Sequence, residues 1–223
     1  MVGEMEMKEF QYILFDLDGT LTNPKEGITK SVAYSLKAFG IEVEDLDSLC
    51  KFIGPPLKES FMKYYGMDSE EGDKAVETYR EYFRPYGVYE NEVYEGIPEL
   101  LSELYDSGKH VILASSKPTV FVETILEHFD LRKYFEVVVG SELDGTRVIK
   151  AEVITYALQQ AGIADKSQVV MVGDREHAVI GAKENEVTVI GVTYGYGSRE
   201  EHENAGADVI VESVEELAHM LGI

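Results

Sequence analysis

The chain carries the stretch YILFDLDGT at residues 12–20, in which a short apolar run leads directly into two aspartates. Continuous apolar runs of this length are typical of strands that are buried on both faces of a parallel sheet. Ligands of such sheets gather at the carboxyl ends of the strands. The stretch therefore predicts a buried first strand that brings Asp16 and Asp18 into a cleft, although Asp-Gly is also common in plain turns.

Similar apolar runs follow from residue 90 onward, and helical patterns separate them. The expected strands are HVILA (110–114), FEVVVG (135–140), QVVMVG (168–173), VTVIGV (187–192) and ADVIV (207–211). The helical patterns include PELLSELYDSG (98–108), AEVITYALQQAG (151–162) and SVEELAHML (213–221). This alternation predicts an α/β fold with a Rossmann-like, doubly wound parallel sheet.

The segment between these two parts has a different pattern. Helical periodicity dominates it, and no strand-like run of comparable strength occurs. The helical stretches are GITKSVAYSLKAFG (27–40), LKESFMKYYG (57–66) and EEGDKAVETYREYFRPYG (70–87). We therefore expect a smaller α-helical cap domain over residues 23–89, inserted into a core domain formed by residues 1–22 and 90–223.

The overall charge excludes several kinds of partner. Against 20 Lys and Arg the chain has 42 Asp and Glu, which gives a formal net charge of −22. Such a chain repels nucleic acid polymers and anionic membranes, since both bind proteins through clustered basic residues. We expect a small-molecule partner, no nucleic acid polymer and no membrane.

Cysteine content and the absence of long apolar runs bear on location. Cys50 is the one cysteine, so the chain forms no intrachain disulfide and no cysteine-based zinc cluster. The start, MVGEMEMKEF, lacks the segments of a secretion signal, and no run of about 18 apolar residues follows. These features predict a cytoplasmic protein and leave monomer and homodimer equally open.

Polar residues also follow the later predicted strands. Ser115 and Ser116 end one strand, Lys150 opens the helix after another, and Asp174 follows a third. Hydroxyls, an ammonium group and a helix N-terminus suit phosphate oxygens. Each residue alone also fits a helix cap, a solvated surface cation or a turn, but their shared position at strand ends favours one site.

Carboxylates gathered at this edge need a counter-charge, because burying adjacent acids alone is costly. A hard divalent cation such as Mg²⁺ prefers oxygen ligands and would relieve that cost. The sequence therefore predicts a magnesium site at the Asp16 and Asp18 pair, to which Asp174 adds a third carboxylate.

On these residues and the FDLDGT stretch, the chain resembles the haloacid dehalogenase-like phosphohydrolases over nearly its whole length. It is most similar to the phosphoglycolate phosphatase-like branch, whose helical cap follows the first strand. The resemblance implies that Asp16 is the nucleophile, Asp18 the general acid/base, and Ser115 and Lys150 phosphate ligands. It also implies Mg²⁺ ligation by Asp16, the backbone carbonyl of Asp18, and Asp174.

Two loops are candidates for substrate contact. Gly54 and Pro55 belong to a Gly-Pro-Pro turn between cap helices, and in the resembling branch a cap loop of this kind helps to select substrates. The turn is equally compatible with a purely structural role. The stretch TYGYGS (193–198) is expected to be a loop beside the site.

One position departs from the family pattern. Relatives usually carry a second acid four residues after the first acid of the GD motif, where this chain has Ala178. Loss of a group that supports a metal costs on the order of 10- to 100-fold in affinity or activity. Glu176 and Glu152 are the candidates to compensate for it.

The first expectation for function is a Mg²⁺-dependent phosphomonoesterase that hydrolyses a small phosphorylated metabolite through an aspartyl-phosphate, with 2-phosphoglycolate as substrate. The alternative within the same chemistry is a nucleoside 5′-monophosphate phosphatase. A phosphoglucomutase-like isomerase and a non-catalytic protein that binds a phosphate ligand are weaker alternatives.

Overall fold

The computed structural model describes residues 9–223, so the N-terminal stretch considered as a secretion signal lies almost wholly outside the described residues. Six parallel strands form the central sheet in the order β5-β4-β1-β6-β7-β8. Their bounds are β1 Tyr12–Phe15, β4 His110–Pro118, β5 Val137–Ser141, β6 Val169–Gly173, β7 Thr188–Val192 and β8 Val209–Val211. The predicted parallel α/β fold is confirmed.

Strand β1 lies in the middle of the sheet, as its apolar sequence requires. Leu14 pairs in register with Ile112 of β4 on one side and with Met171 of β6 on the other. Side chains alternate between the two faces, so Ile13 and Phe15 join one apolar cluster and Leu14 joins the other. The strand is therefore fully buried, and its carboxyl end lies between those of β4 and β6.

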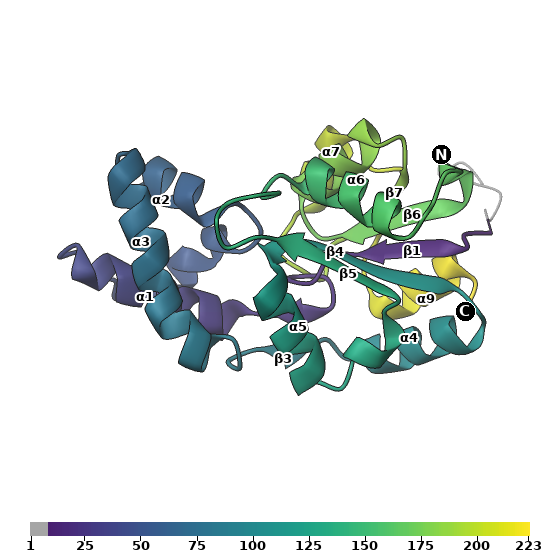
Figure 1. Cartoon of the computed structure of the whole chain (residues 1–223), viewed down its shortest axis with the longest axis horizontal. Helices are drawn as coiled ribbons and strands as arrows, with labels where there is room; N and C mark the ends of the chain where they lie inside the picture. The colour runs from purple at the N-terminus through teal and green to yellow at the C-terminus, as the bar shows by residue number, and fades with distance from the viewer. Residues whose placement is uncertain (1–8) are drawn as a thin grey trace.

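Helices cover both faces of the sheet (Figure 1). One face packs against α4 Ile97–Asp106, α5 Thr119–His128 and α9 Val214–Leu221. The other packs against α6 Lys150–Gln160 and α7 Glu176–Glu184. The short helix α8, Arg199–Ala205, follows β7.

The predicted cap segment is helical and projects from one end of the sheet (Figure 1). It contains α1 Lys25–Ala38, a 3₁₀ helix Leu46–Phe52, α2 Leu57–Tyr65, α3 Ser69–Tyr82 and a π-helical turn Phe83–Gly87. Apolar side chains of these helices, such as Leu36 and Phe61, belong to the same buried cluster as one face of the core. Burial of this shared surface holds the two parts together.

Two short strands at the base of the cap segment were not expected from the sequence. The strands β2 Thr22–Asn23 and β3 Glu92–Val93 pair in antiparallel fashion where the chain enters and leaves the helical segment. Two residues are too few to produce a detectable period, which explains why the pattern did not reveal them.

Strand β4 also differs from the expectation, because it continues to Pro118 instead of ending at residue 114. After an irregularity in the register, Pro118 pairs with Ser141 of β5. Ser115 and Ser116, which were expected to end the strand, therefore lie within it.

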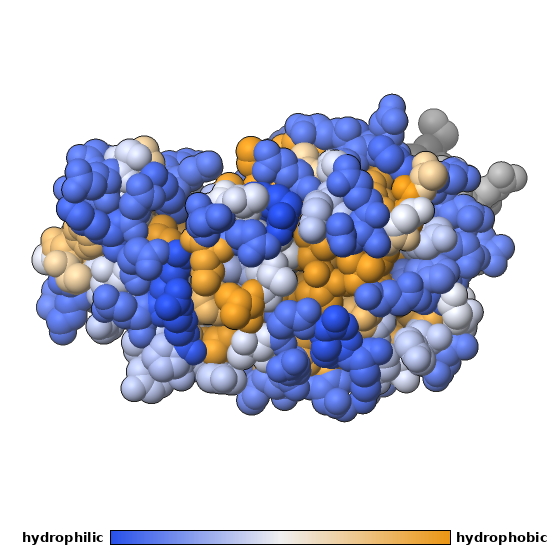
Figure 2. All heavy atoms as spheres, in the orientation of Figure 1, coloured by the Kyte–Doolittle hydropathy of each residue, from blue (hydrophilic) through white to orange (hydrophobic). Residues whose placement is uncertain are grey.

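The outer surface is mostly hydrophilic, and the apolar residues on the face shown in Figure 2 gather mainly over β4 and β5. In the part of the chain that the structure describes, no helix combines the length and the apolar character needed to span a bilayer.

Candidate active site

The order of the strands brings three predicted residues to one edge of the sheet. Asp16 follows β1, Ser115 lies near the end of the neighbouring β4, and Asp174 follows the other neighbour, β6. All three side chains are buried. The sequence placed these residues at strand ends, and the sheet order makes those ends adjacent.

Asp16 has a fixed orientation. Its Oδ2 lies 2.7 Å from Nζ of Lys150, and its Oδ1 accepts a hydrogen bond of 2.8 Å from the backbone N–H of Leu17. The side chains of Asp16 and Lys150 are only 11% and 5% exposed, so water screens their attraction weakly.

Lys150 is the first residue of α6, as predicted, but it is not a surface cation. Its ammonium group also donates a hydrogen bond of 3.1 Å to the carbonyl of Ala114, at the end of the apolar part of β4. One lysine thus joins Asp16, directly after β1, to Ala114 in the middle of β4. The interpretation of Lys150 as a solvated surface residue is wrong.

Asp174 is the most buried carboxylate of the site, at 1% exposure. Its Oδ2 accepts a hydrogen bond of 2.9 Å from the backbone N–H of Tyr196. That contact confirms that the loop at residues 193–198 lies beside the site. Burial, followed by repulsion from Asp16, raises the pKa of Asp174 to about 7.

Gly19 allows the chain to pass close to Asp174. A Cβ at this position would lie 1.9 Å from Oδ2 of Asp174, and the φ angle of +77° also favours glycine. The glycine of the DLDG stretch therefore has a physical role in this fold. It lets the turn after β1 close against the acid after β6.

These residues fit a hard divalent cation. Oδ1 of Asp174 is buried and has no hydrogen-bond partner among the described residues, and the neighbouring acid Asp16 leaves this pocket short of positive charge. The available ligands are oxygens, which Mg²⁺ prefers. Asp16, Asp174 and the backbone carbonyl of Asp18 are the groups that would hold the ion.

The carboxylate set of this site is small. Within residues 9–223 no three side chains of His, Cys, Asp or Glu are grouped so as to hold a metal ion. Ala178 is fully buried, and a Cβ on Gly173 would lie 2.3 Å from its Cβ. Glu176 and Glu152 are both exposed, so neither occupies a buried position like that of Asp174.

Asp18 faces a partner that the sequence did not predict. Its Oδ2 lies 2.6 Å from Nζ of Lys117, and the two side chains are 12% and 7% exposed. The same ammonium group lies 4.9 Å from the centre of the Phe83 ring, at the end of the cap helices. The available signal was the position of Lys117 directly after the two serines of β4.

The two serines have different surroundings. Ser115 is buried, and its Oγ accepts a hydrogen bond of 3.3 Å from the backbone N–H of Lys117. Ser116 lines the neighbouring cavity, and its carbonyl accepts a hydrogen bond of 2.8 Å from Oγ of Ser141. Ser115 thus lies at the strand ends with Asp16, and Ser116 one residue farther along.

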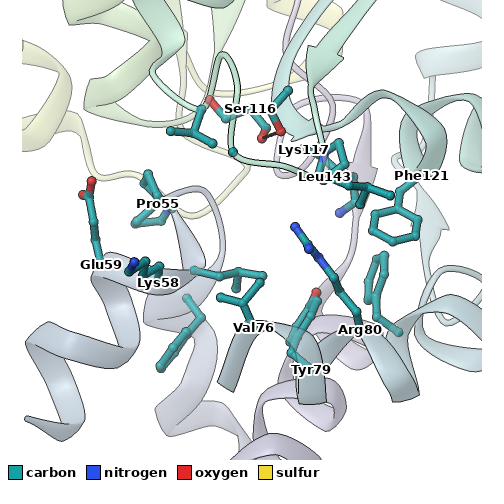
Figure 3. A pocket seen from close by; sticks show the side chains of 18 of the residues that line it. Pro55, Lys58, Glu59, Val76, Tyr79, Arg80, Ser116, Lys117, Phe121 and Leu143 are labelled. Atoms are coloured by element: carbon teal, nitrogen blue, oxygen red, sulfur yellow. Dashed lines mark hydrogen bonds between the residues drawn. The ribbon is translucent and has the colours of Figure 1, made fainter. Parts of the chain in front are cut away.

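A cavity of about 590 Å³ lies between these strand ends and the cap (Figure 3). Asp18, Ser116 and Lys117 form part of its core side, and Gly54 and Pro55 form part of its cap side. The structure thus places the predicted Gly-Pro-Pro turn opposite the core residues. The remaining cap-side lining includes Ile28, Phe52, Val76, Tyr79, Arg80 and Phe83.

Several polar cap residues that the sequence analysis did not single out also line the cavity: Lys58, Glu59, Asp73, Glu77, Tyr79 and Arg80. Figure 3 shows Tyr79 and Arg80 at the end of α3, with the Arg80 side chain extending into the cavity toward the side of Lys117 and Leu143. Burial raises the pKa of the Tyr79 phenol well above its usual range, so its hydroxyl keeps its proton.

Comparison with known proteins identifies the family of this site. The family model described as "Haloacid dehalogenase-like hydrolase" matches residues 13–192. This range includes Asp16, Asp18, Lys150 and Asp174. The chain belongs to the haloacid dehalogenase-like hydrolases. Its membership confirms the resemblance drawn from the FDLDGT stretch and the parallel fold.

Individual relatives narrow the activity to a phosphatase. A 5′-nucleotidase of Pseudomonas aeruginosa is 50% identical over 189 residues, which is 85% of each chain. A crystal structure of a predicted phosphatase from Clostridium acetobutylicum is 55% identical, covers 96% of this chain and 99% of its own, and superposes with a TM-score of 0.93.

A phosphoglycolate phosphatase of Vibrio parahaemolyticus is 24% identical over 227 residues, covering 98% of this chain and 99% of its own. The haloacid dehalogenase-like chain described here is therefore a phosphatase.

Proposed function

We propose that the chain is a Mg²⁺-dependent phosphomonoesterase whose substrates are nucleoside 5′-monophosphates. The observation that carries this proposal is the cavity of about 590 Å³ between the strand ends and the cap. Binding sites for ligands of drug size occupy roughly 300–1,000 Å³. A nucleoside monophosphate matches this range, whereas 2-phosphoglycolate would leave most of the cavity to water.

The walls of the cavity support the same choice. Its cap side is rich in apolar and aromatic side chains, which suit a planar base. The Tyr79 hydroxyl and the Arg80 guanidinium add donors where a sugar or base carries oxygen and nitrogen acceptors. The likeness to the 5′-nucleotidase, at 50% identity, also favours the nucleotide over the smaller substrate.

The proposed first step uses Asp16 as nucleophile. Its carboxylate attacks the phosphorus, an aspartyl-phosphate bond forms, and the bond to the ester oxygen breaks. Lys150, at 2.7 Å from Oδ2 of Asp16, reduces the repulsion between this carboxylate and the phosphate and stabilises charge on the transferring group. Ser115, within the same strand edge, donates to a phosphate oxygen.

Asp18 moves the proton in both steps. It protonates the leaving alkoxide in the first step and accepts a proton from the attacking water in the second, which restores free Asp16 and releases phosphate. A proton donor cannot at the same moment be the anionic half of an ion pair. The contact between Asp18 and Lys117 therefore has to change during turnover.

When bound by Asp16, Asp174 and the Asp18 carbonyl, Mg²⁺ would supply further neutralisation of phosphate charge. The buried, unpartnered Oδ1 of Asp174 supports this assignment.

A phosphate-release assay tests the proposal. The protein is assayed with Mg²⁺ on a panel of nucleoside 5′-monophosphates, 2-phosphoglycolate, a hexose phosphate and p-nitrophenyl phosphate, with the Asp16→Asn variant as control for contaminating activity. We expect kcat/KM for at least one nucleotide to exceed that for 2-phosphoglycolate by about tenfold or more. This is the selectivity that contact with one additional small apolar group provides. Chelation with EDTA should abolish turnover, and added Mg²⁺ should restore it.

A reversed order, with 2-phosphoglycolate as the better substrate, would return the assignment to the smaller metabolite. Isomerisation of the hexose phosphate without phosphate release would indicate a mutase. Absence of turnover with every divalent metal would favour a binding protein.

A further inference from the structure

Arg175 follows the site acid Asp174 directly, yet its side chain leaves the site and reaches the cap. Its Nη1 donates a hydrogen bond of 2.8 Å to the backbone carbonyl of Ile53. Ile53 immediately precedes Gly54, Pro55 and Pro56, here called the Gly54–Pro56 turn, and all three residues of this turn line the cavity. Among the described residues this is the one hydrogen bond that joins residues 41–81 of the cap to the core.

The other end of the Arg175 side chain is fixed by the core. Its Nε lies 2.8 Å from Oε1 of Glu201 in α8. The same oxygen accepts a second hydrogen bond of 2.8 Å from the backbone N–H of Glu176, at the start of α7. The side chains of Arg175 and Glu201 are 17% and 20% exposed, so the guanidinium is held in one place before it meets the cap.

The Gly54–Pro56 turn is also pressed against the aliphatic part of Arg175. A Cβ at Gly54 would lie 3.0 Å from Cγ of Arg175, and the φ angle of Gly54 is +102°, in the region that favours glycine. A larger residue at this position would push the turn away from the core. The Arg175 side chain thus both packs against Gly54 and donates a hydrogen bond to the neighbouring residue Ile53.

We propose that Arg175 is a positioning residue that fastens the Gly54–Pro56 turn over the cavity. In this role the core, through Glu201 and Arg175, sets the position of the cap wall that meets the part of the substrate remote from the phosphate. The effect on substrate selection rests on the proposed phosphatase function toward nucleotides. The fastening itself does not depend on the substrate.

The chain contains a native probe of this contact. Cys50 is the one cysteine of the sequence and lies three residues before Ile53, partly buried. Burial raises the pKa of the Cys50 thiol. Cys50 belongs to the 3₁₀ helix Leu46–Phe52 and packs, like Tyr196 of the core loop, against the apolar cluster that cap and core share. Release of the turn should make the thiol more reactive.

The experiment measures the rate of Cys50 modification by dithionitrobenzoate in the full chain without substrate, together with KM and kcat for a nucleoside 5′-monophosphate and for p-nitrophenyl phosphate. The variants are Arg175→Ala and Gly54→Ala, which disturb the contact from its two sides. Arg199→Ala is the matched control, because Arg199 pairs with Glu212 at 2.8 Å within the core.

We expect Arg175→Ala and Gly54→Ala to raise the modification rate and the nucleotide KM by about tenfold, the value of a hydrogen bond with a charged partner. KM for p-nitrophenyl phosphate should change less, because this substrate reaches less of the cap wall. Arg199→Ala should give the same values as the protein without substitutions. Arg175→Lys keeps the charge but not the forked geometry, so it should show smaller increases in the modification rate and in KM than Arg175→Ala does.

If Cys50 in both Arg175→Ala and Gly54→Ala reacts as slowly as in the protein without substitutions, the fastening is overturned, whichever substrates the enzyme accepts. A raised thiol rate with an unchanged ratio of the two KM values would overturn the link to substrate selection. If the unmodified protein hydrolyses no nucleotide, the proposed function fails, and the thiol rates still decide whether Arg175 fastens the turn.

Discussion

The core edge of the cavity and its cap side are built from different interactions. At the core edge, the charged groups are buried in pairs, such as Asp16 with Lys150 and Asp18 with Lys117. On the cap side the wall combines apolar side chains with charged ones, and its ion pairs, such as Lys58 with Asp73, are exposed. Buried pairs hold fixed geometry, whereas exposed pairs contribute little energy.

This difference separates two tasks. Attack on phosphorus requires charges held to within a fraction of an ångström, and strand ends in a packed sheet provide that. Contact with the rest of the substrate requires shape and apolar area, and the cap helices provide that without buried ion pairs of the kind found at the core edge. Changes at the core edge should therefore alter the rate for every substrate, and changes in the cap should alter the order of preference among substrates.

The largest effect is expected for Asp16→Asn. The amide preserves the shape but removes the anionic attacking oxygen, so kcat should fall by about 10⁴-fold or more for all substrates, as for loss of other catalytic nucleophiles. Phosphate release and thermal unfolding are measured together, with the exposed residue Asp106 changed to Asn as control. Near-normal turnover of folded Asp16→Asn with Mg²⁺ present would rule out the covalent mechanism.

Asp18→Asn should produce a smaller and more selective loss. Without a proton donor, hydrolysis of alkyl phosphates such as nucleotides should slow by about 10²- to 10⁴-fold. p-Nitrophenyl phosphate should lose less, because nitrophenolate leaves without protonation. The measurement is the ratio of kcat values for the two substrates. Equal losses for both would contradict the role of Asp18 as the acid for the leaving group.

The sequence revealed mainly features that are formed by residues close together in the chain. The parallel fold and the strand-end positions of Asp16 and Asp174 followed from apolar runs and from the family motif. Such information is local in sequence, since a strand and the residue at its end are neighbours in the chain. The left-handed turn at Gly19 likewise belongs to the same stretch.

Contacts between distant segments could not be predicted in this way. Lys117 meets Asp18 across 99 residues of sequence, and Arg175 meets Ile53 across 122. The local sequence around Lys117 or Arg175 does not indicate which residue each contacts. The partner depends on how the strands and the cap pack together. The extension of β4 beyond residue 114 has the same origin, in pairing with β5.

Ala178→Asp tests the missing carboxylate of the core edge and should have an intermediate effect. An acid one helical turn beyond Asp174 would orient a metal-bound water or Lys150, and the Mg²⁺ concentration for half-maximal activity should fall by about tenfold. Metal titrations of both proteins measure this. An unchanged or weaker dependence on Mg²⁺ would show that the site has no deficit at position 178.

The same substitution has a consequence for stability. Ala178 is fully buried in the apolar cluster beneath β6, so a new carboxylate there lacks water. Without metal, the free energy of unfolding should decrease by about 3 kcal/mol, the scale for an unpaired buried charge. Urea unfolding with and without Mg²⁺ distinguishes the cost of the buried charge from a general loss of packing. Bound Mg²⁺ should restore the free energy of unfolding only if the buried charge caused the decrease.

The smallest effect is expected in the cap, for Pro55→Ala. Pro55 lines the cavity opposite Ser116 and Lys117, so a smaller side chain removes apolar contact from the substrate without touching the phosphate ligands. The ratio of kcat/KM values for a nucleotide and p-nitrophenyl phosphate should fall by about tenfold, the lower end of the range for loss of one small apolar group from a pocket. Pro98→Ala, at the start of α4 and outside the residues that line the cavity, is the matched control. If Pro55→Ala leaves every substrate ratio unchanged, the Gly54–Pro56 turn is a structural element, and selectivity has to be sought at Tyr79 and Arg80.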